Sequence, residues 1–137
     1  MTDYFHLNID RAALLSLSTL GLAHLGDGVY ELMVRSYLCL HGRSTNKGLH
    51  KAAVGYVSAP AQSAAVAVIL PLLTPEEEEV FRRGRNASPH TIPAHAKRED
   101  YARATALEAL FGWLWLRGET GRLNALFEKI MEDTLWP

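Results

Sequence analysis

The stretch "LGLAHLGDGVYELMVR", residues 20–35, decides the fold of this chain. Projected on a helix, its apolar residues lie on nearly every side, which is typical of a helix buried in a protein core. Ser18 just before it is a good N-cap residue and Gly42 is a typical stop, so the pattern predicts a helix from 18 or 19 to 40. Asp27 stands in the middle of this helix, where a carboxylate is costly to bury unless it is paired, protonated or bound to a metal ion.

Two glycines, Gly26 and Gly28, flank this aspartate. Together they cost a helix about 1–2 kcal/mol relative to alanine. Close packing of another helix would explain such small residues, and so would the close approach of a ligand. We leave both explanations open from the sequence.

A second apolar stretch, "YARATALEALFGWLWL" at residues 101–116, predicts another core helix from 98 or 99 to 117. If the two helices pack together, Glu108 could face Asp27. Glu31 follows Asp27 by four residues and therefore projects from the same helical face. Carboxylates that converge from neighbouring helices are how helical bundles build sites for hard divalent cations, so this set is a candidate magnesium site.

Structural ion pairs are the alternative explanation of these carboxylates. Asp27 could pair with Arg35, and Glu108 with Arg103 or Arg122. The flanking glycines favour a special role for Asp27 without excluding such pairs.

The remaining chain also has helical patterns, and runs typical of strands are lacking. We expect an all-α fold in one domain, residues 1–137, with further helices over about 10–17, 47–55, 58–71, 74–84 and 120–136. Ser58 and Thr74 are the expected caps of two of these helices, and Gly84 is an expected stop. The non-periodic stretch "RNASPHTIPAHAK" after it predicts a loop.

Composition narrows the classes of protein. The net charge is −1, so any site for nucleic acid must be a local patch rather than a global basic field. A single cysteine excludes an internal disulfide and a CxxC zinc motif, which fits a reducing cytoplasm. The chain start does not read as a signal peptide, and no apolar run is long enough to span a bilayer, so we expect a cytoplasmic protein with no membrane partner.

Two groups of polar residues are candidate RNA contacts, because guanidinium and ammonium groups suit phosphate oxygens. The first group lies near the predicted loop and the second shares one face of the predicted 47–55 helix. They are Arg82, Arg83, Arg85 and Asn86, and Lys47, His50 and Lys51. The alternative for both is an ordinary solvated helix surface, and for the first group "EEEE" just before it offsets the charge.

Four ordered motifs resemble one known family. "LAHLGDGVYELMVR" resembles the signature helix of the ribonuclease III fold, and "YARATALEALFGWLWLRG" resembles the second signature helix of that fold. "KAAVGYVSAPAQ" and "FRRGRNA" narrow the resemblance to Mini-ribonuclease III, whose members lack a double-stranded-RNA-binding domain. The resemblance runs from about residue 20 to 126.

This resemblance implies an all-helical ribonuclease III endonuclease domain that acts as a homodimer. It implies cleavage of double-stranded RNA with Mg²⁺, in the maturation of the large-subunit ribosomal RNA precursor. Matched by position, Asp27 and Glu108 are the catalytic residues and metal ligands. Whether a ribosomal protein assists by presenting the substrate is left open.

Two positions depart from the larger ribonuclease III enzymes, which carry carboxylates there. Ala23 stands four residues before Asp27, and Thr105 three residues before Glu108. We hypothesise that Glu31 compensates as a ligand, directly or through water. These losses favour the rival interpretation, a non-catalytic scaffold that binds structured RNA or ribosomal proteins. The retained carboxylates favour the enzyme and leave a plain helical interaction module unsupported.

Overall fold

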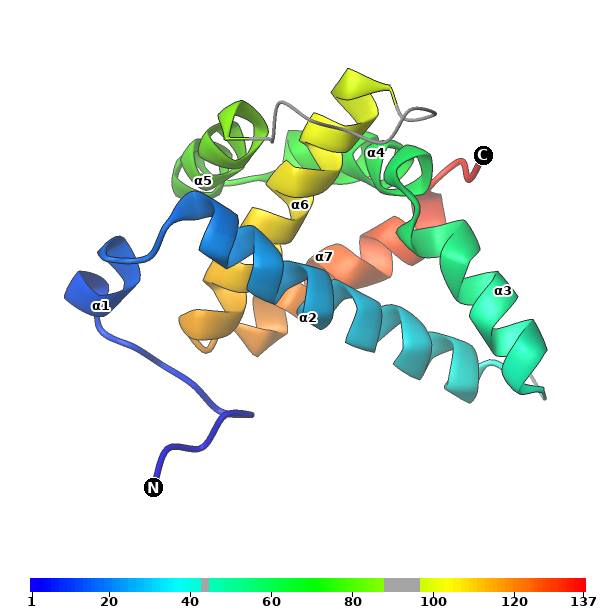
Figure 1. The fold of residues 1–137 in the computed structure, drawn as a ribbon, viewed down its shortest axis with the longest axis horizontal. Coiled ribbons are helices and arrows are strands. Elements are labelled where there is room, and N and C mark those ends of the chain that lie inside the picture. Colours follow the sequence, from blue (N-terminus) through cyan, green and yellow to red (C-terminus); the bar gives the residue numbers. More distant parts are fainter. Residues whose placement is uncertain (43–44, 88–96) are drawn as a thin grey trace.

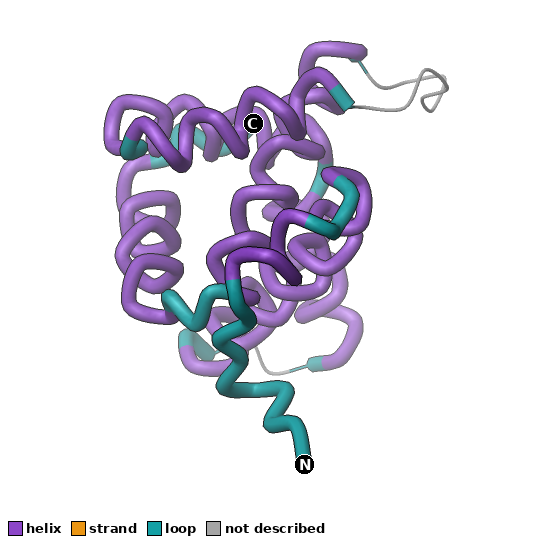
Figure 2. Tube along the Cα trace, turned by 90° about the vertical axis from the view of Figure 1, so that its left-hand side faces the viewer, coloured by secondary structure: helices purple, strands orange, loops and turns teal. Residues whose placement is uncertain are grey.

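The computed structural model describes residues 1–42, 45–87 and 97–137. Every regular element in these ranges is a helix (Figure 2), which confirms the all-α prediction. In chain order the helices are α1 (Arg11–Leu15), α2 (Thr19–Leu40), α3 (Asn46–Val57), α4 (Ala59–Ile69), the 3₁₀ helix η1 (Leu70–Leu72), α5 (Pro75–Asn86), α6 (Arg98–Leu116) and α7 (Thr120–Asp133). Most of the loop predicted after α5, residues 88–96, lies outside the described residues.

The centre of the fold is the crossing of α2 and α6 (Figure 1). A Cβ atom on Gly26 would lie 1.5 Å from the backbone oxygen of Glu108, and one on Gly112 would lie 2.1 Å from that of Leu22. Neither position can hold a side chain, so the two backbones touch. Helix packing is therefore the explanation of Gly26. Gly28 differs, because nothing lies within 4 Å of the place where its Cβ would be.

The two crossing helices are buried to different extents. α6 is buried on nearly every side between Ala102 and Leu114, as its sequence predicts. The buried residues of α2 lie on one stripe, and Leu20 and Leu32 on its outer side are 47% and 51% exposed. The prediction that α2 is buried all round is therefore wrong, because α6 and its neighbours cover only one face of it.

Helix ends follow the expected cap residues. The side chains of Ser18, Ser58 and Thr74 each accept a hydrogen bond from the backbone N–H three residues further on. Ser58 also ends α3, so α3 and α4 meet there directly. Gly42 adopts a positive φ angle of 90° after α2, which confirms the predicted stop there, and Gly118 adopts a positive φ angle of 72° after α6.

Two predicted ends are wrong. Gly84 does not stop α5, which continues to Asn86. Its missing side chain serves packing instead, since a Cβ there would lie 2.8 Å from the Cα of Ala106 on α6. The last helix, α7, ends at Asp133, and Trp136 beyond it packs edge-on against Tyr56 with ring centroids 4.7 Å apart.

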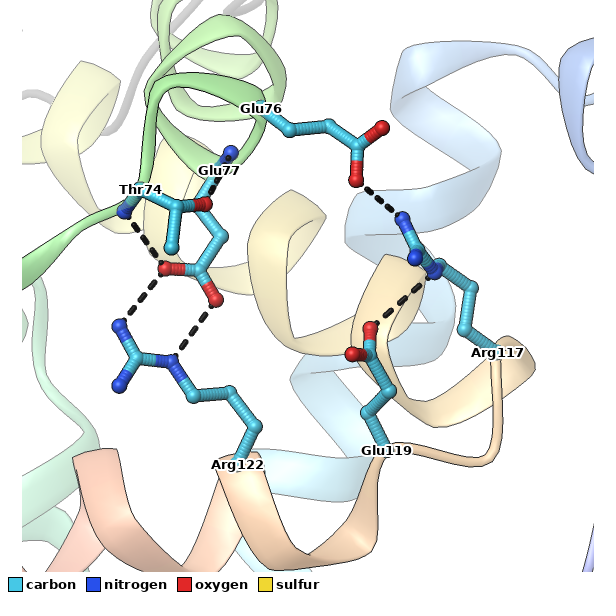
Figure 3. Close-up of polar contacts among 6 residues, drawn as sticks. All are labelled: Thr74, Glu76, Glu77, Arg117, Glu119 and Arg122. Carbon is cyan, nitrogen blue, oxygen red and sulfur yellow. Dashed lines mark hydrogen bonds and ion pairs between the residues drawn. The ribbon is translucent and has the colours of Figure 1, made fainter.

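An ion-pair clamp joins the start of α5 to α7 (Figure 3). Glu77 is 4% exposed and accepts hydrogen bonds from Nε and Nη2 of Arg122 at 2.9 and 2.8 Å. Thr74 and Glu77 form a capping box, in which the Thr74 backbone N–H donates to Glu77 Oε1 at 2.9 Å. Beside it Arg117 pairs with Glu76 and Glu119. The clamp therefore ties the first turn of α5 to the start of α7.

In the described ranges, no single helix has the length and apolar character to cross a membrane, and one bent helix pair, Asn46–Val57 with Ala59–Leu72, has them by length and composition.

Candidate functional site

The α2–α6 crossing brings Asp27 and Glu108 together. Gly26, the residue before Asp27, rests on the backbone of Glu108 itself, so the two carboxylates leave adjacent points of two touching helices. The side chains are close enough for the Asp27 carboxylate to influence the ionisation of Glu108 both by its charge and by a hydrogen bond. The expectation that Glu108 faces Asp27 is thus realised by the structure.

Glu108 has a strongly perturbed pKa. Burial raises it first, the negative charge of Asp27 and a hydrogen bond with Asp27 raise it further, and a hydrogen bond from Gln62 works in the opposite direction; the result is a pKa of about 8. A carboxyl group in this state is protonated at neutral pH unless a cation arrives to neutralise the pair. Such perturbed groups are typical of functional sites.

The two carboxylates differ in exposure. Glu108 is half-buried, whereas Asp27 lies on the exposed side of α2. The idea of a desolvated Asp27 deep in the core is therefore wrong. The pair instead spans the boundary between core and solvent, where an ion and a large substrate can reach it.

The three arginines that the sequence offered as partners of Asp27 and Glu108 pair with other carboxylates. Arg35 donates to Glu31 at 2.9 Å, and Arg122 holds Glu77. Arg103 lies 3.4 Å from Glu99. In the described part of the chain, Asp27 and Glu108 thus have no arginine or lysine partner, which removes the structural ion pair as an explanation of their placement.

Glu31 lies half-buried one turn beyond Asp27, paired with Arg35 in an i, i+4 ion pair. Within the described residues, no three side chains of the histidine, cysteine, aspartate or glutamate type are grouped to hold a metal ion. The role of Glu31 as a third metal ligand stays a hypothesis, and Glu31 would have to release Arg35 before it could bind an ion.

Ala23 and Thr105, the two positions that depart from the larger ribonuclease III enzymes, lie one helical turn before Asp27 and Glu108. Ala23 and Thr105 are each 6% exposed. The Thr105 hydroxyl donates to the Tyr101 backbone oxygen of its own helix at 3.0 Å. Neither residue adds an anionic ligand, so the described site has two carboxylates.

Gln62 is a site residue that the sequence reasoning missed. It sits near the start of α4, is 3% exposed, and its Nε2 contacts Glu108 Oε2 at 3.5 Å. The available signal was a lone amide in the otherwise small and apolar helix "APAQSAAVAVI". A buried amide in such a helix needs a partner, and here one partner is Glu108.

The α5 arginines that we expected to contact RNA are exposed, but carboxylates of the protein hold them. Arg82 and Arg83 both donate to Glu79, and Arg85 donates to Glu99 at 3.0 Å. The hydrogen bond from Arg82 leads the causes that hold the pKa of Glu79 at about 2. Asn86, the last residue of α5, is exposed.

The candidate contacts on α3 differ from those on α5. Lys47, His50 and Lys51 are all exposed and share one helix face. No ion pair is found for them within the described ranges. His50 also lines a cavity of about 270 Å³ between α2 and α3, together with Arg35 and Asn46.

Known proteins are similar to this chain in sequence and in fold. A family model described as "Ribonuclease III domain" matches residues 20–119, which include both carboxylates. The chain is 43% identical to a "Mini-ribonuclease 3" of Symbiobacterium thermophilum, over 83% of this chain and 88% of that protein. It is 41% identical to a "Mini-ribonuclease 3" of a Thermoanaerobacter species, over 88% and 84%. A crystal structure of a Fusobacterium nucleatum protein matches with a TM-score of 0.78 at 29% identity, covering 85% of this chain and 93% of that chain.

Proposed function

The chain belongs to the Mini-ribonuclease 3 family and is an endoribonuclease of the ribonuclease III type, and we propose that it cleaves double-stranded RNA with magnesium held by Asp27 and Glu108. The observation that carries the proposal is the carboxylate pair at the α2–α6 crossing. When both are ionised its members repel one another, and the described residues supply no arginine or lysine to neutralise them.

The residues present fit Mg²⁺. Carboxylate oxygens are hard ligands, and magnesium sites often use one or two carboxylates, several waters and oxygens of a substrate phosphate. Burial is the first cause of the raised pKa of Glu108, and the next, the unneutralised negative charge of Asp27, is one that a bound divalent ion would offset. A two-carboxylate site therefore suits an enzyme whose substrate brings phosphate oxygens.

The carboxylates divide the work by their exposure. Asp27 is exposed on α2, where a substrate phosphate could approach, and half-buried Glu108 would hold the ion against the core. Bound magnesium would lower the pKa of a coordinated water and offset charge on the scissile phosphate. In the pattern of the family the ribose 3′ oxygen leaves, and no side-chain nucleophile is required.

A homodimer is part of the proposal, because the described residues of one chain form one such site and a duplex has two strands. The apolar residues Val29, Met33 and Tyr37 of α2 are candidates for the interface by sequence, but Val29 is buried within its own chain. Leu32 is a better candidate, since it is exposed beside a shallow cavity of about 120 Å³ that Met33 and Trp115 help to line. Leu32→Glu should yield a monomer in light scattering and abolish double-strand cleavage.

We propose that two exposed surfaces bind the RNA. One is the α3 face with Lys47, His50 and Lys51, and the other consists of the α5 arginines with Asn86. Duplex RNA is recognised mainly through its shape, phosphates and 2′-hydroxyls. Replacing Arg82, Arg83 and Arg85 with alanine should flatten the salt dependence of RNA binding. A slope equal to that of the wild type would assign the grip to α3.

We further propose that the chain is a single catalytic domain and that its substrate is the large-subunit ribosomal RNA precursor in the cytoplasm, as the family resemblance implies. A ribosomal protein could present that substrate. Cleavage of the naked precursor, compared with cleavage in the presence of ribosomal proteins, measures that assistance.

The test of the function is incubation of labelled duplex RNA with Mg²⁺ and either the wild type or Asp27→Asn. Cleavage by the wild type and its loss in the variant support the enzyme. Binding without cleavage by both proteins would instead support the non-catalytic scaffold that Ala23 and Thr105 favour.

A further inference from the structure

Three buried side-chain oxygens have no hydrogen-bond partner in the described residues: Tyr30 Oη, Gln62 Oε1 and Thr134 Oγ1. An unpartnered buried polar atom costs about 1–3 kcal/mol. Tyr30 lies in an aromatic cluster with Phe111 and Phe127, at centroid distances of 5.3 and 6.1 Å. Of the three residues, Gln62 is the one whose side chain contacts the carboxylate pair.

The orientation of the Gln62 amide follows from its partners. Its Nε2 donates to the backbone oxygen of Val57 at 3.0 Å, and a carbonyl oxygen can only accept. The same Nε2 is the atom that contacts Glu108 Oε2, at 3.5 Å. The amide nitrogen is thus shared between the end of α3 and the carboxylate of α6, and Oε1 is left over as a bare acceptor.

From these contacts we infer that Gln62 is a positioning residue for the metal site: its amide N–H steadies the Glu108 carboxylate beside Asp27, and its Oε1 accepts a hydrogen bond from a water molecule in the hydration shell of the ion. The inference rests on the proposed function. Magnesium usually keeps several of its waters, so such a water needs acceptors that are not themselves ligands.

The thinned ligand set explains why an amide would matter here. Ala23 and Thr105 supply no carboxylate, and the Thr105 hydroxyl already donates to its own helix. A neutral amide oxygen can support the ion's waters without adding a third negative charge to a pair that already repels. The contact of 3.5 Å between Gln62 Nε2 and Glu108 Oε2 is at the long end of hydrogen-bond distances.

The competing explanation is that Gln62 merely caps the last carbonyl of α3. Two variants separate the explanations, because a cap affects only stability. Gln62→Met has a similar length but neither donates nor accepts strongly, and Gln62→Glu puts a third carboxylate beside Glu108. Both should lower the melting temperature of the metal-free protein, since both remove the donor to Val57.

Their effects on metal binding should have opposite signs. In a Mg²⁺ titration followed by the rise in melting temperature, Gln62→Met should bind about tenfold more weakly than the wild type, as expected for loss of an outer-shell partner. Gln62→Glu should bind several-fold more tightly. Tyr30→Phe, which removes another unpartnered oxygen on the core side of α2, is the matched control and should leave Mg²⁺ binding unchanged.

If both Gln62 variants bind Mg²⁺ within twofold of the wild type while the Asp27→Asn test succeeds, the inference is overturned and the proposed function stands. If the wild type neither binds Mg²⁺ nor cleaves duplex RNA, the proposed function fails and this inference fails with it.

Discussion

Two glutamates on packed helices, Glu77 and Glu108, meet opposite surroundings. Burial alone would raise the pKa of Glu77, but the hydrogen bonds and charge of Arg122 and the Thr74 backbone outweigh burial and hold that pKa below its ordinary value (Figure 3). Glu108 faces another carboxylate, Asp27, and its pKa rises to about 8. The same side chain is therefore held ionised at one end of α5 and pushed toward its neutral form at the helix crossing.

The difference distinguishes a finished ion pair, Glu77 with Arg122, whose counter-charge lies within the chain, from an open pair, Asp27 with Glu108, which has none in the described residues. The clamp at Glu77 contains its counter-charge within the chain, with two hydrogen bonds from Arg122 at 2.9 and 2.8 Å. The pair at Glu108 has no such partner in the described residues, so its counter-charge must come from outside. A structural carboxylate is thus neutralised by a cationic side chain of the protein, whereas a ligand-binding carboxylate needs a cation from solution.

The largest expected effect comes from removing one of the two charges of the Asp27–Glu108 pair. Glu108→Gln keeps the size of the side chain but removes its charge, so the cleavage rate should fall at least about 100-fold with the loss of an interaction of several kcal/mol at the metal. Single-turnover cleavage of duplex RNA measures this. Glu128→Gln, on the exposed side of α7, is the control; an unchanged rate in Glu108→Gln would contradict the proposed site.

Breaking the finished pair should instead cost stability. Arg122→Met leaves Glu77 buried without its counter-charge and should lower the free energy of unfolding by about 3 kcal/mol at pH 7. Urea denaturation measures the loss. Lys129→Met on the same helix is the matched control, because Lys129 is half exposed and lies 3.8 Å from Asp133 in a pair that contributes little. A loss equal to that of the control would mean that Arg122 does not stabilise Glu77.

The sequence predicted the parts of this comparison that depend on local pattern. Core helices and caps such as Ser58 follow from periodicity and local residue types. The facing of Asp27 and Glu108 was one of the alternatives that spacing left open, and the family resemblance favoured it. The destination of each arginine did not follow, because Arg122 meets Glu77 across 45 residues of chain and no local rule selects it over Glu108. For the same reason the role of Gly84 in packing, rather than in ending α5, required the tertiary structure.

The open pair also predicts an unusual pH dependence in metal-free protein. Because the folded-state pKa of Glu108 lies above its unfolded value of about 4.5, its contribution is fully present below pH 4.5 and is lost as pH rises through about 8. Glu108→Gln should therefore match the wild type in acid and exceed its stability by about 1–3 kcal/mol above pH 8. Thermal melts across pH measure the crossover.

Added Mg²⁺ gives the control for that pH effect. The ion should stabilise the wild type at pH 8, where it can bind the deprotonated pair, and leave Glu108→Gln nearly unchanged. The contribution of Glu77 has the opposite sign, since its pKa is lowered: it is present above about pH 4.5 and lost as pH falls. Wild-type stability that rose steadily from pH 5 to pH 9 without metal would contradict the assignment at Glu108.

The smallest effect on stability concerns a third arrangement, the exposed pairs of Glu79 with Arg82 and Arg83. Solvent screens these pairs, so Glu79→Gln should leave the melting temperature nearly unchanged. It should nevertheless tighten duplex binding a few-fold at low salt and steepen the salt dependence, because two arginines become available to phosphates. Glu78→Gln removes the same charge from the same helix without releasing an arginine. Equal tightening by both variants would mean that net charge, rather than arginine release, governs binding.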